Sequence, residues 1–160
     1  MRFAVIGTNF ITDRLLTAAG EVPGFRLEAV CSRTRERGRE YAAKWGAPGV
    51  FTDLDELAAC PEVDAVYIAS PNALHRAQAV RMLRAGKHVL CEKPAGVYTK
   101  QVREMNAEAD KHPDLVFGMM FNQRTNCVYR KIKEMIDGGE LGQLKRVNWI
   151  ITDWYRTQYY

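Results

Sequence analysis

The sequence HVLCEKP, residues 88–94, places a charged pair and a proline directly after a short apolar run. The apolar run is typical of a strand buried on both faces of a parallel sheet. Ligands of such sheets bind beyond the carboxyl ends of the strands, so we expect Lys93 to stand at the mouth of a site. Pro94 ends the strand and fixes the exit of the backbone, and a cis peptide bond there would aim Lys93. The alternative is an ordinary solvated lysine in a loop.

The composition predicts one ordinary domain without a membrane or nucleic-acid partner. The chain has 160 residues, 47% of them hydrophobic, and its formal charge of +4 is spread among acidic residues. No apolar run is long enough for a signal segment or a membrane span, so we expect a cytoplasmic protein. The four cysteines, Cys31, Cys60, Cys91 and Cys127, form no Cys-x-x-Cys pair. We therefore expect reduced thiols and no metal site.

The first turn has the pattern of strand, tight turn and helix. Residues 2–6 predict a strand, and GTNFIT, residues 7–12, leads into an amphipathic helix. A helix start of this kind binds phosphate, because its first N–H groups have no partner within the helix. Gly7 begins a Gly-x-Gly-x-x-Gly pattern, but Asn9 and Thr12 replace the later glycines. Asn9 tolerates left-handed backbone angles, so the turn can survive. The pattern fits a nucleotide site or an ordinary connection equally well.

The end of the second predicted strand favours NADP over NAD. Residues 25–31 form this strand, and Ser32 and Arg33 follow it, with Thr34 as the N-cap of the next helix. In a dinucleotide fold an acidic residue here selects the free ribose 2′-hydroxyl, whereas arginine accommodates a 2′-phosphate. No Asp or Glu stands at this point, and a hydroxyl beside a guanidinium suits phosphate. The alternative is that the arginines are solvated residues at a helix start.

The remaining segments continue the alternation of strands and helices. We expect strands at 50–51, 64–69 and 115–120, and helices that begin near Thr52, Asn72 and Thr99. Asn72 is a good N-cap, and His75 lies one turn into its helix, where a surface histidine is as plausible as a functional one. The whole order predicts an α/β fold, a doubly wound parallel sheet of the Rossmann, NAD(P)-binding type.

Three motifs together resemble the Gfo/Idh/MocA oxidoreductases, relatives of glucose-fructose oxidoreductase and inositol dehydrogenase. They are GTNFI at residues 7–11, IASPNALH at 68–75 and GKHVLCEKP at 86–94. The resemblance implies a nicotinamide-dependent enzyme that moves hydride to or from a CH–OH or C=O carbon, commonly on a sugar or cyclitol. Lys93 matches the family's catalytic lysine, which shares or relays the proton of the substrate hydroxyl. The cofactor-binding positions are then Gly7, Thr8, Asn9, Phe10, Ile11, Ser32, Arg33, Ser70, Pro71, Asn72, His75, Glu92, Lys93 and Arg124.

The last part of the sequence predicts the start of a second, α+β domain. Residues 1–124 are the expected dinucleotide-binding domain, and 125–160 supply one helix (126–136) and one long strand (143–153). A single strand cannot stand alone, and its aromatic residues have nothing here to cover them. We therefore expect a truncated chain that binds a dinucleotide but turns over no sugar, and an exposed strand favours a homo-oligomer. The competing interpretation is a non-catalytic sensing module that uses this aromatic segment for protein contact.

Overall fold

The structure is a computed structural model that describes residues 1–150, and it divides into two compact units. The first unit is Met1–Phe121, and the second begins at Asn122. Each unit is described by itself. Among residues 1–150, no helix is both long and apolar enough to cross a membrane. Within the same residues, no group of three or more His, Cys, Asp or Glu side chains could hold a metal ion.

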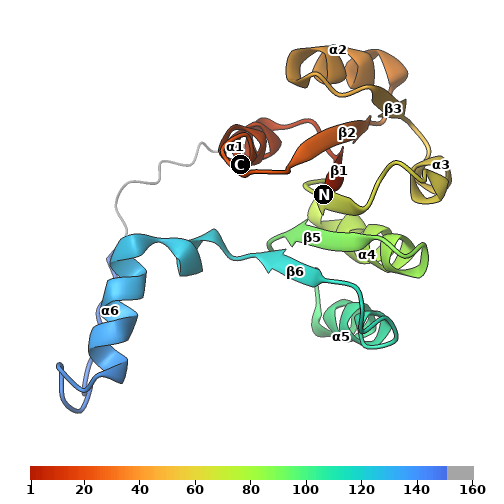
Figure 1. Cartoon of the computed structure of the whole chain (residues 1–160). Coiled ribbons are helices and arrows are strands. Elements are labelled where there is room, and N and C mark those ends of the chain that lie inside the picture. The colour runs from red at the N-terminus through yellow and green to blue at the C-terminus, as the bar shows by residue number, and fades with distance from the viewer. Residues whose placement is uncertain (151–160) are drawn as a thin grey trace, which may run out of the picture. The chain divides into compact units, whose positions relative to one another are not determined.

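The first unit is a doubly wound α/β sheet (Figure 1). Its six strands lie in the order β3-β2-β1-β4-β5-β6, and every neighbouring pair is parallel. The predicted Rossmann fold is therefore confirmed. The elements in chain order are β1 (Arg2–Ile6), α1 (Phe10–Ala19), β2 (Arg26–Cys31), α2 (Arg35–Trp45), β3 (Gly49–Phe51), α3 (Leu54–Ala59), β4 (Ala65–Ile68), the 3₁₀ helix η1 (Asn72–Leu74), α4 (His75–Arg84), β5 (His88–Glu92), α5 (Thr99–Ala109) and β6 (Phe117–Met120).

The order of the strands creates a switch point beside β1. The chain goes from β1 to β2 and β3 on one side, then returns to β4 on the other. Ile6 at the end of β1 pairs with Cys31 of β2 and Ile68 of β4, and Ile68 pairs with Cys91 of β5. The turns after these four strands therefore leave the sheet at one edge, where ligands of such folds bind.

The core lies on both faces of the sheet, because side chains alternate along each strand. Ala4 and Ile6 of β1 pack with buried residues of α3, α4 and α5, whereas Val5 packs with buried residues of α1 and α2. Val66 and Tyr67 of β4 divide in the same way. This double burial explains the continuous apolar runs of the sequence.

Helix starts follow the predicted caps only in part. The Thr34 hydroxyl accepts a hydrogen bond from Arg37 N, as predicted, and α2 begins directly after it. The prediction for Thr52 was wrong by one residue, because Asp53 Oδ1 accepts from the first amides of α3. Asn72 caps no helix, since it opens the 3₁₀ turn η1, and α4 starts at His75 without a side-chain cap. Thr99 is the first residue of α5 rather than its cap.

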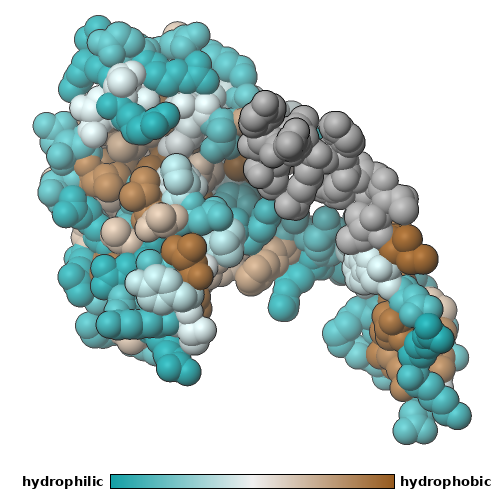
Figure 2. All heavy atoms as spheres, turned by 180° about the vertical axis from the view of Figure 1, so that it is seen from behind, coloured by the Kyte–Doolittle hydropathy of each residue, from teal (hydrophilic) through white to brown (hydrophobic). Residues whose placement is uncertain are grey.

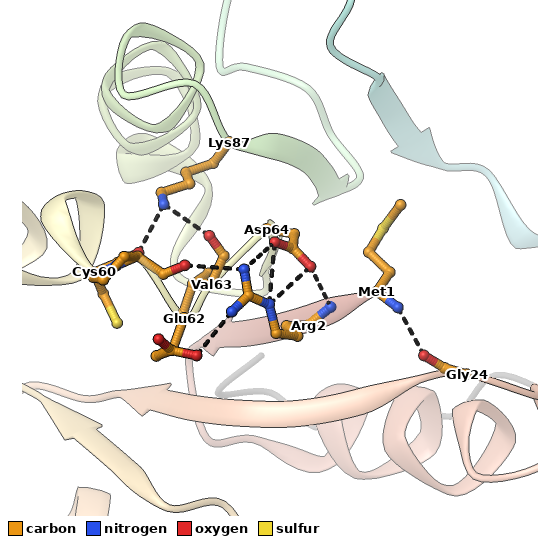
Figure 3. A network of polar contacts seen from close by, with 9 residues as sticks. Met1, Arg2, Gly24, Cys60, Glu62, Val63, Asp64 and Lys87 are labelled. Carbon is orange, nitrogen blue, oxygen red and sulfur yellow. Dashed lines mark hydrogen bonds and ion pairs between the residues drawn. The ribbon is translucent and has the colours of Figure 1, made fainter.

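A network of hydrogen bonds and ion pairs lies at the edge of the sheet opposite the switch-point turns (Figure 3). The Arg2 side chain donates to both carboxylate oxygens of Asp64, to Glu62 and to the Pro61 carbonyl oxygen. Lys87 Nζ donates to the carbonyl oxygens of Cys60 and Val63, both at 2.7 Å. Two cations therefore hold the loop between α3 and β4. Since Arg2 binds the Asp64 carboxylate, the pKa of Asp64 lies well below its usual value.

We expect Asp64→Asn to lower the midpoint of thermal unfolding by a few degrees near pH 7. An aspartate whose pKa is lower in the folded than in the unfolded state stabilises the fold above about pH 4, and this contribution is lost as the pH falls through the folded pKa. The difference between the wild-type and variant midpoints should therefore shrink on acidification. Calorimetric scans between pH 7 and pH 2 measure this, and Asp110→Asn, on a surface helix end, is the control. A difference that stays constant with pH would contradict the prediction.

The second unit contains a 3₁₀ turn, η2 (Asn122–Thr125), and the helix α6 (Cys127–Asp137). Asn126 caps α6 by accepting from Val128 N at 2.9 Å. Hydrophobic atoms lie at the surface of this unit among polar ones (Figure 2). Its exposed large apolar residues are Val128, Ile132, Ile136, Leu141, Leu144, Val147, Trp149 and Ile150.

The predicted strand at 143–153 is wrong for the residues that the structure describes, because 143–150 form no strand. A strand needs a hydrogen-bonding neighbour, and the described part of the second unit has no other strand to pair with it. Trp149 instead lies against the Tyr129 ring of α6, with ring centroids 5.1 Å apart. The remaining residues of the prediction, including Trp154, Tyr155, Tyr159 and Tyr160, lie outside the described part of the chain.

Candidate functional site

A cavity of about 850 Å³ opens at the carboxyl ends of β1, β2 and β4. This volume lies in the range of small-molecule sites. Its lining comes from the turns after β1, β2, β3 and β4 and from residues of α2, α3, η1 and α4. Seven of the predicted site residues line it: Gly7, Thr8, Asn9, Ser32, Arg33, Ser70 and Pro71. The structure therefore brings half of the predicted cofactor positions to one place.

Gly7 lies where the backbone of the first turn passes close to the backbone of the turn after β4. Its φ of +108° is a conformation that side chains rarely adopt. A Cβ atom on Gly7 would lie 2.5 Å from the Ala69 carbonyl oxygen, far inside contact distance. The Gly7 amide also donates to the Cys31 carbonyl oxygen. A glycine is therefore required at this position, where the chain leaves β1 beside the ends of β2 and β4.

Asn9 stabilises the start of α1 instead of adopting a left-handed conformation. Its φ is −108° and its ψ 176°, so the backbone is extended and the turn does not use the tolerance of asparagine for left-handed angles. Its Oδ1 accepts hydrogen bonds from Ile11 N at 2.9 Å and Thr12 N at 3.4 Å, and its Nδ2 donates to the Ala69 carbonyl oxygen at 2.6 Å. The side chain thus occupies N–H groups that a glycine would leave for a ligand.

Thr12 stands at the third glycine position of the pattern and is fully buried. Its hydroxyl donates to the Gly7 carbonyl oxygen at 3.0 Å, so the turn closes around it. The substitutions at both glycine positions therefore add hydrogen bonds within the turn. The neighbouring predicted residues Phe10 and Ile11 do not line the cavity, and Phe10 is exposed.

Two arginines lie at the cavity after β2. Arg33 is exposed at the rim, and Arg37, one helical turn later on α2, also lines the cavity. Arg37 donates from Nη2 to the Thr8 carbonyl oxygen at 3.1 Å and from Nε to the Thr8 hydroxyl at 3.3 Å. Sequence reasoning missed Arg37, because only the packing of α2 brings this residue to the cavity. The Ser32 hydroxyl donates to the Thr34 carbonyl oxygen.

The turn after β4 is held by α4. The Ser70 hydroxyl donates to Gln78 Oε1 at 2.6 Å, and Gln78, which the sequence did not single out, also lines the cavity. His75 is buried, with 1% of its surface exposed, so the alternative of a surface histidine is wrong. Its ring lies within hydrogen-bond distance of the Ser70 and Pro94 carbonyl oxygens. Asn72 is exposed and does not line the cavity.

The turn after β5 presents Lys93 on a buried support. The Tyr67 hydroxyl donates to Glu92 Oε1 at 2.7 Å, and Lys93 N donates to Glu92 Oε2 at 3.3 Å. Burial and the contact with Glu92 raise the pKa of Tyr67, so its hydroxyl stays a donor. The Lys93–Pro94 bond is cis, which is the arrangement considered from the sequence.

Lys93 itself is exposed and does not line the cavity. It follows β5, which is separated from β1 by β4 alone. Two strand spacings amount to roughly 10 Å along the same sheet edge. Arg124 belongs to the second unit, so its predicted role at the cavity stays a prediction.

Comparisons with known proteins agree with this arrangement. The family model described as "Oxidoreductase family, NAD-binding Rossmann fold" (GFO_IDH_MocA) matches residues 1–119. The scyllo-inositol 2-dehydrogenase (NADP(+)) IolU of Bacillus subtilis is 56% identical over 109 residues, which are 68% of this chain and 33% of that protein. The 1,5-anhydro-D-fructose reductase of Ensifer adhaerens is 34% identical over 142 residues, 89% of this chain and 42% of that protein.

Solved structures of oxidoreductases are also similar to this chain. The scyllo-inositol dehydrogenase of Lactobacillus casei with bound NAD(H) and scyllo-inositol superposes with a TM-score of 0.83 at 28% identity, covering 89% of this chain and 42% of that one. KijD10, a 3-ketoreductase of Actinomadura kijaniata in complex with TDP-benzene and NADP, matches with a TM-score of 0.79 at 32% identity, covering 87% of this chain and 44% of that one. The chain thus spans less than half the length of these relatives.

Proposed function

The chain belongs to the Gfo/Idh/MocA oxidoreductase family and has its NAD-binding Rossmann fold, and on this premise we propose that it forms the cofactor half of a sugar or cyclitol dehydrogenase. Such an enzyme transfers hydride between a nicotinamide cofactor and a CH–OH or C=O carbon. The observation that carries the proposal is the meeting of the turns after β1, β2 and β4 at one cavity with Gly7 at its base. Two relatives whose names give a cyclitol or sugar substrate support the substrate class.

The residues present fit a dinucleotide. Gly7 leaves the backbone of the first turn open to a pyrophosphate, Arg33 and Arg37 offer cations near the adenosine end, and Ser70 and Pro71 lie toward β5. The cofactor supplies the hydride acceptor or donor. We propose that Lys93 exchanges the proton of the substrate hydroxyl, because it follows β5 at the same edge of the sheet as the cavity and its backbone amide is held by Glu92.

We also propose that the preferred cofactor is NADP. The turn after β2, residues 32–34, has no carboxylate, whereas Arg33 of this turn and Arg37 of α2 both line the cavity. Two guanidinium groups at the same cavity suit the dianionic 2′-phosphate of NADP. The Bacillus subtilis relative is named as an NADP(+) enzyme, and KijD10 was solved with NADP, whereas the Lactobacillus casei enzyme was solved with NAD(H).

Calorimetric titration of the 160-residue chain with NADPH and NADH tests the site and the preference together. We expect NADPH to bind at least tenfold more tightly, since one hydrogen bond to a charged group contributes roughly 1.5–3 kcal/mol. Arg33→Ala should remove most of that difference while leaving NADH affinity unchanged. Arg35→Ala is the matched control, because Arg35 makes the same charge change without lining the cavity. Equal affinity for both cofactors would contradict the NADP preference, and no binding of either would contradict the dinucleotide site.

We propose further that residues 1–124 form the cofactor domain and that residues from 125 on begin a second domain that supplies the substrate pocket. The division of the chain at Asn122 supports this boundary. The lengths of the relatives support a second domain larger than the part of it present in the 160 residues. The chain by itself should therefore bind the cofactor without turning over a sugar.

A further inference from the structure

Arg37 reaches from α2 to the first turn, and two kinds of contact hold it there. Its Nε donates to the Thr8 hydroxyl at 3.3 Å, and its Nη2 donates to the Thr8 carbonyl oxygen at 3.1 Å. The guanidinium also lies over the buried ring of Tyr41, 5.8 Å from the ring centroid. These contacts keep the guanidinium at the cavity that Arg37 lines.

The contact of Arg37 with Glu40 is of a different kind, because it is an exposed ion pair on one helix. Arg37 Nη1 donates to Glu40 Oε2 at 2.8 Å, three residues further along α2. The Glu40 side chain is 71% exposed, and within residues 1–150 it makes no other hydrogen bond or ion pair. Such a pair contributes little to stability, so a stronger anion can replace the carboxylate.

The donors of Arg37 show where the competition arises. A guanidinium has five N–H groups. Within the described residues Thr8 accepts from two of them and Glu40 from one, so a ligand has two left. A phosphate bound there would lie beside the Glu40 carboxylate, and like charges repel. NADH has a neutral hydroxyl where NADPH has its 2′-phosphate, so this repulsion distinguishes the two cofactors.

We propose that Glu40 is a specificity-determining residue of the cofactor site, a carboxylate that competes with the 2′-phosphate of NADP for Arg37. Thr8 and Tyr41 hold the guanidinium in place, so the exchange requires only the Glu40 side chain to move. Arg33 makes no hydrogen bond or ion pair within residues 1–150, so it meets the phosphate without this competition. The inference rests on the proposed function, because it names what limits NADP affinity at that same site.

Calorimetric titration of the 160-residue chain and its Glu40→Gln variant with NADPH and NADH tests the competition. We expect Glu40→Gln to bind NADPH about fivefold more tightly than the wild type, the size of an exposed charge interaction with a doubly charged anion. The affinity for NADH should stay unchanged. Glu36→Gln is the matched control, because Glu36 is exposed on the same helix and contacts neither Arg37 nor the cavity within the described residues. It should change NADPH affinity by less than twofold.

A double-mutant cycle with Arg37→Ala shows whether Glu40 acts through Arg37. In the Arg37→Ala background, Glu40→Gln should give no more NADPH affinity than Glu36→Gln gives. An equal gain in the two glutamate variants, a gain that persists without Arg37, or an equal gain for NADH would overturn the inference and leave the proposed function standing. If no variant bound either cofactor, the proposed function would fail and the inference with it.

Discussion

Gly7→Ala should abolish dinucleotide binding and destabilise the first unit by on the order of 3 kcal/mol. The new methyl group would meet the Ala69 carbonyl oxygen at 2.5 Å and its carbon at 2.8 Å, and backbone atoms cannot move aside as a flexible side chain can. The residue must also keep a φ of +108°, which costs further free energy for an alanine. Relief of the overlap requires β1 and β4 to separate at the edge where the cavity opens.

Gly24→Ala is the matched control for this prediction. Gly24 has a φ of +82°, but a Cβ there would have no atom within 4 Å. Its substitution therefore measures the backbone cost alone, roughly 1 kcal/mol, and should leave NADPH binding intact. Denaturant unfolding gives both free energies, and titration with NADPH gives both affinities. If the two variants lost the same stability and bound NADPH equally, the close approach of Gly7 to Ala69 would have no functional consequence.

The sequence predicted the sheet well because its strands are buried on both faces. Runs such as AVI in β1 and AVYI in β4 do not alternate with charged residues, as a strand with one solvent-exposed face would. A sequence pattern typical of a helix follows each run. Parallel strands joined by helices allow few topologies, so the convergence of the turns followed from the alternation itself. The cavity that Gly7 lines lies at this edge of the sheet.

The errors concern residues whose role depends on contacts across the fold. The 3₁₀ turn η1 follows β4 and precedes α4. Asn72 lies in this turn and caps no helix, and His75, the first residue of α4, is buried. The sequence indicated only that Asn9 tolerates left-handed angles, whereas its extended backbone lets the side-chain amide bind both α1 and Ala69. No local pattern reports a contact that spans sixty residues. Arg37 and Gln78 were missed in the same way, since only the packed helices bring them to the cavity.

The most consequential assignment is Lys93, and the structure limits what its role can be. Its side chain is exposed, whereas Glu92 before it is buried and bound to Tyr67. A solvated lysine in an ordinary loop needs no such support for its backbone. A lysine whose backbone is held in place while its amine stays exposed can meet a substrate that arrives from outside this domain. Lys93 should therefore affect the reaction much more than it affects cofactor affinity.

Lys93→Met should lower kcat by roughly 10²- to 10⁴-fold, the usual contribution of a general acid or base, and leave NADPH affinity nearly unchanged. Because we propose that a second domain supplies the substrate pocket, the rate is measured in a chimera that carries the corresponding part of a relative 56% identical over 109 residues. Methionine keeps the length of the side chain and removes its ability to exchange a proton. Steady-state rates with a cyclitol substrate and calorimetric titration with NADPH give the two quantities.

Lys100→Met is the control for this variant, because it makes the same chemical change at an exposed position at the start of α5. It should keep both the rate and the affinity. A loss of NADPH affinity in Lys93→Met as large as its loss of rate would show that Lys93 binds the cofactor and does not transfer the proton. A rate equal to that of the control would show that another group exchanges the proton, and the turn at Pro94 would then have only a structural role.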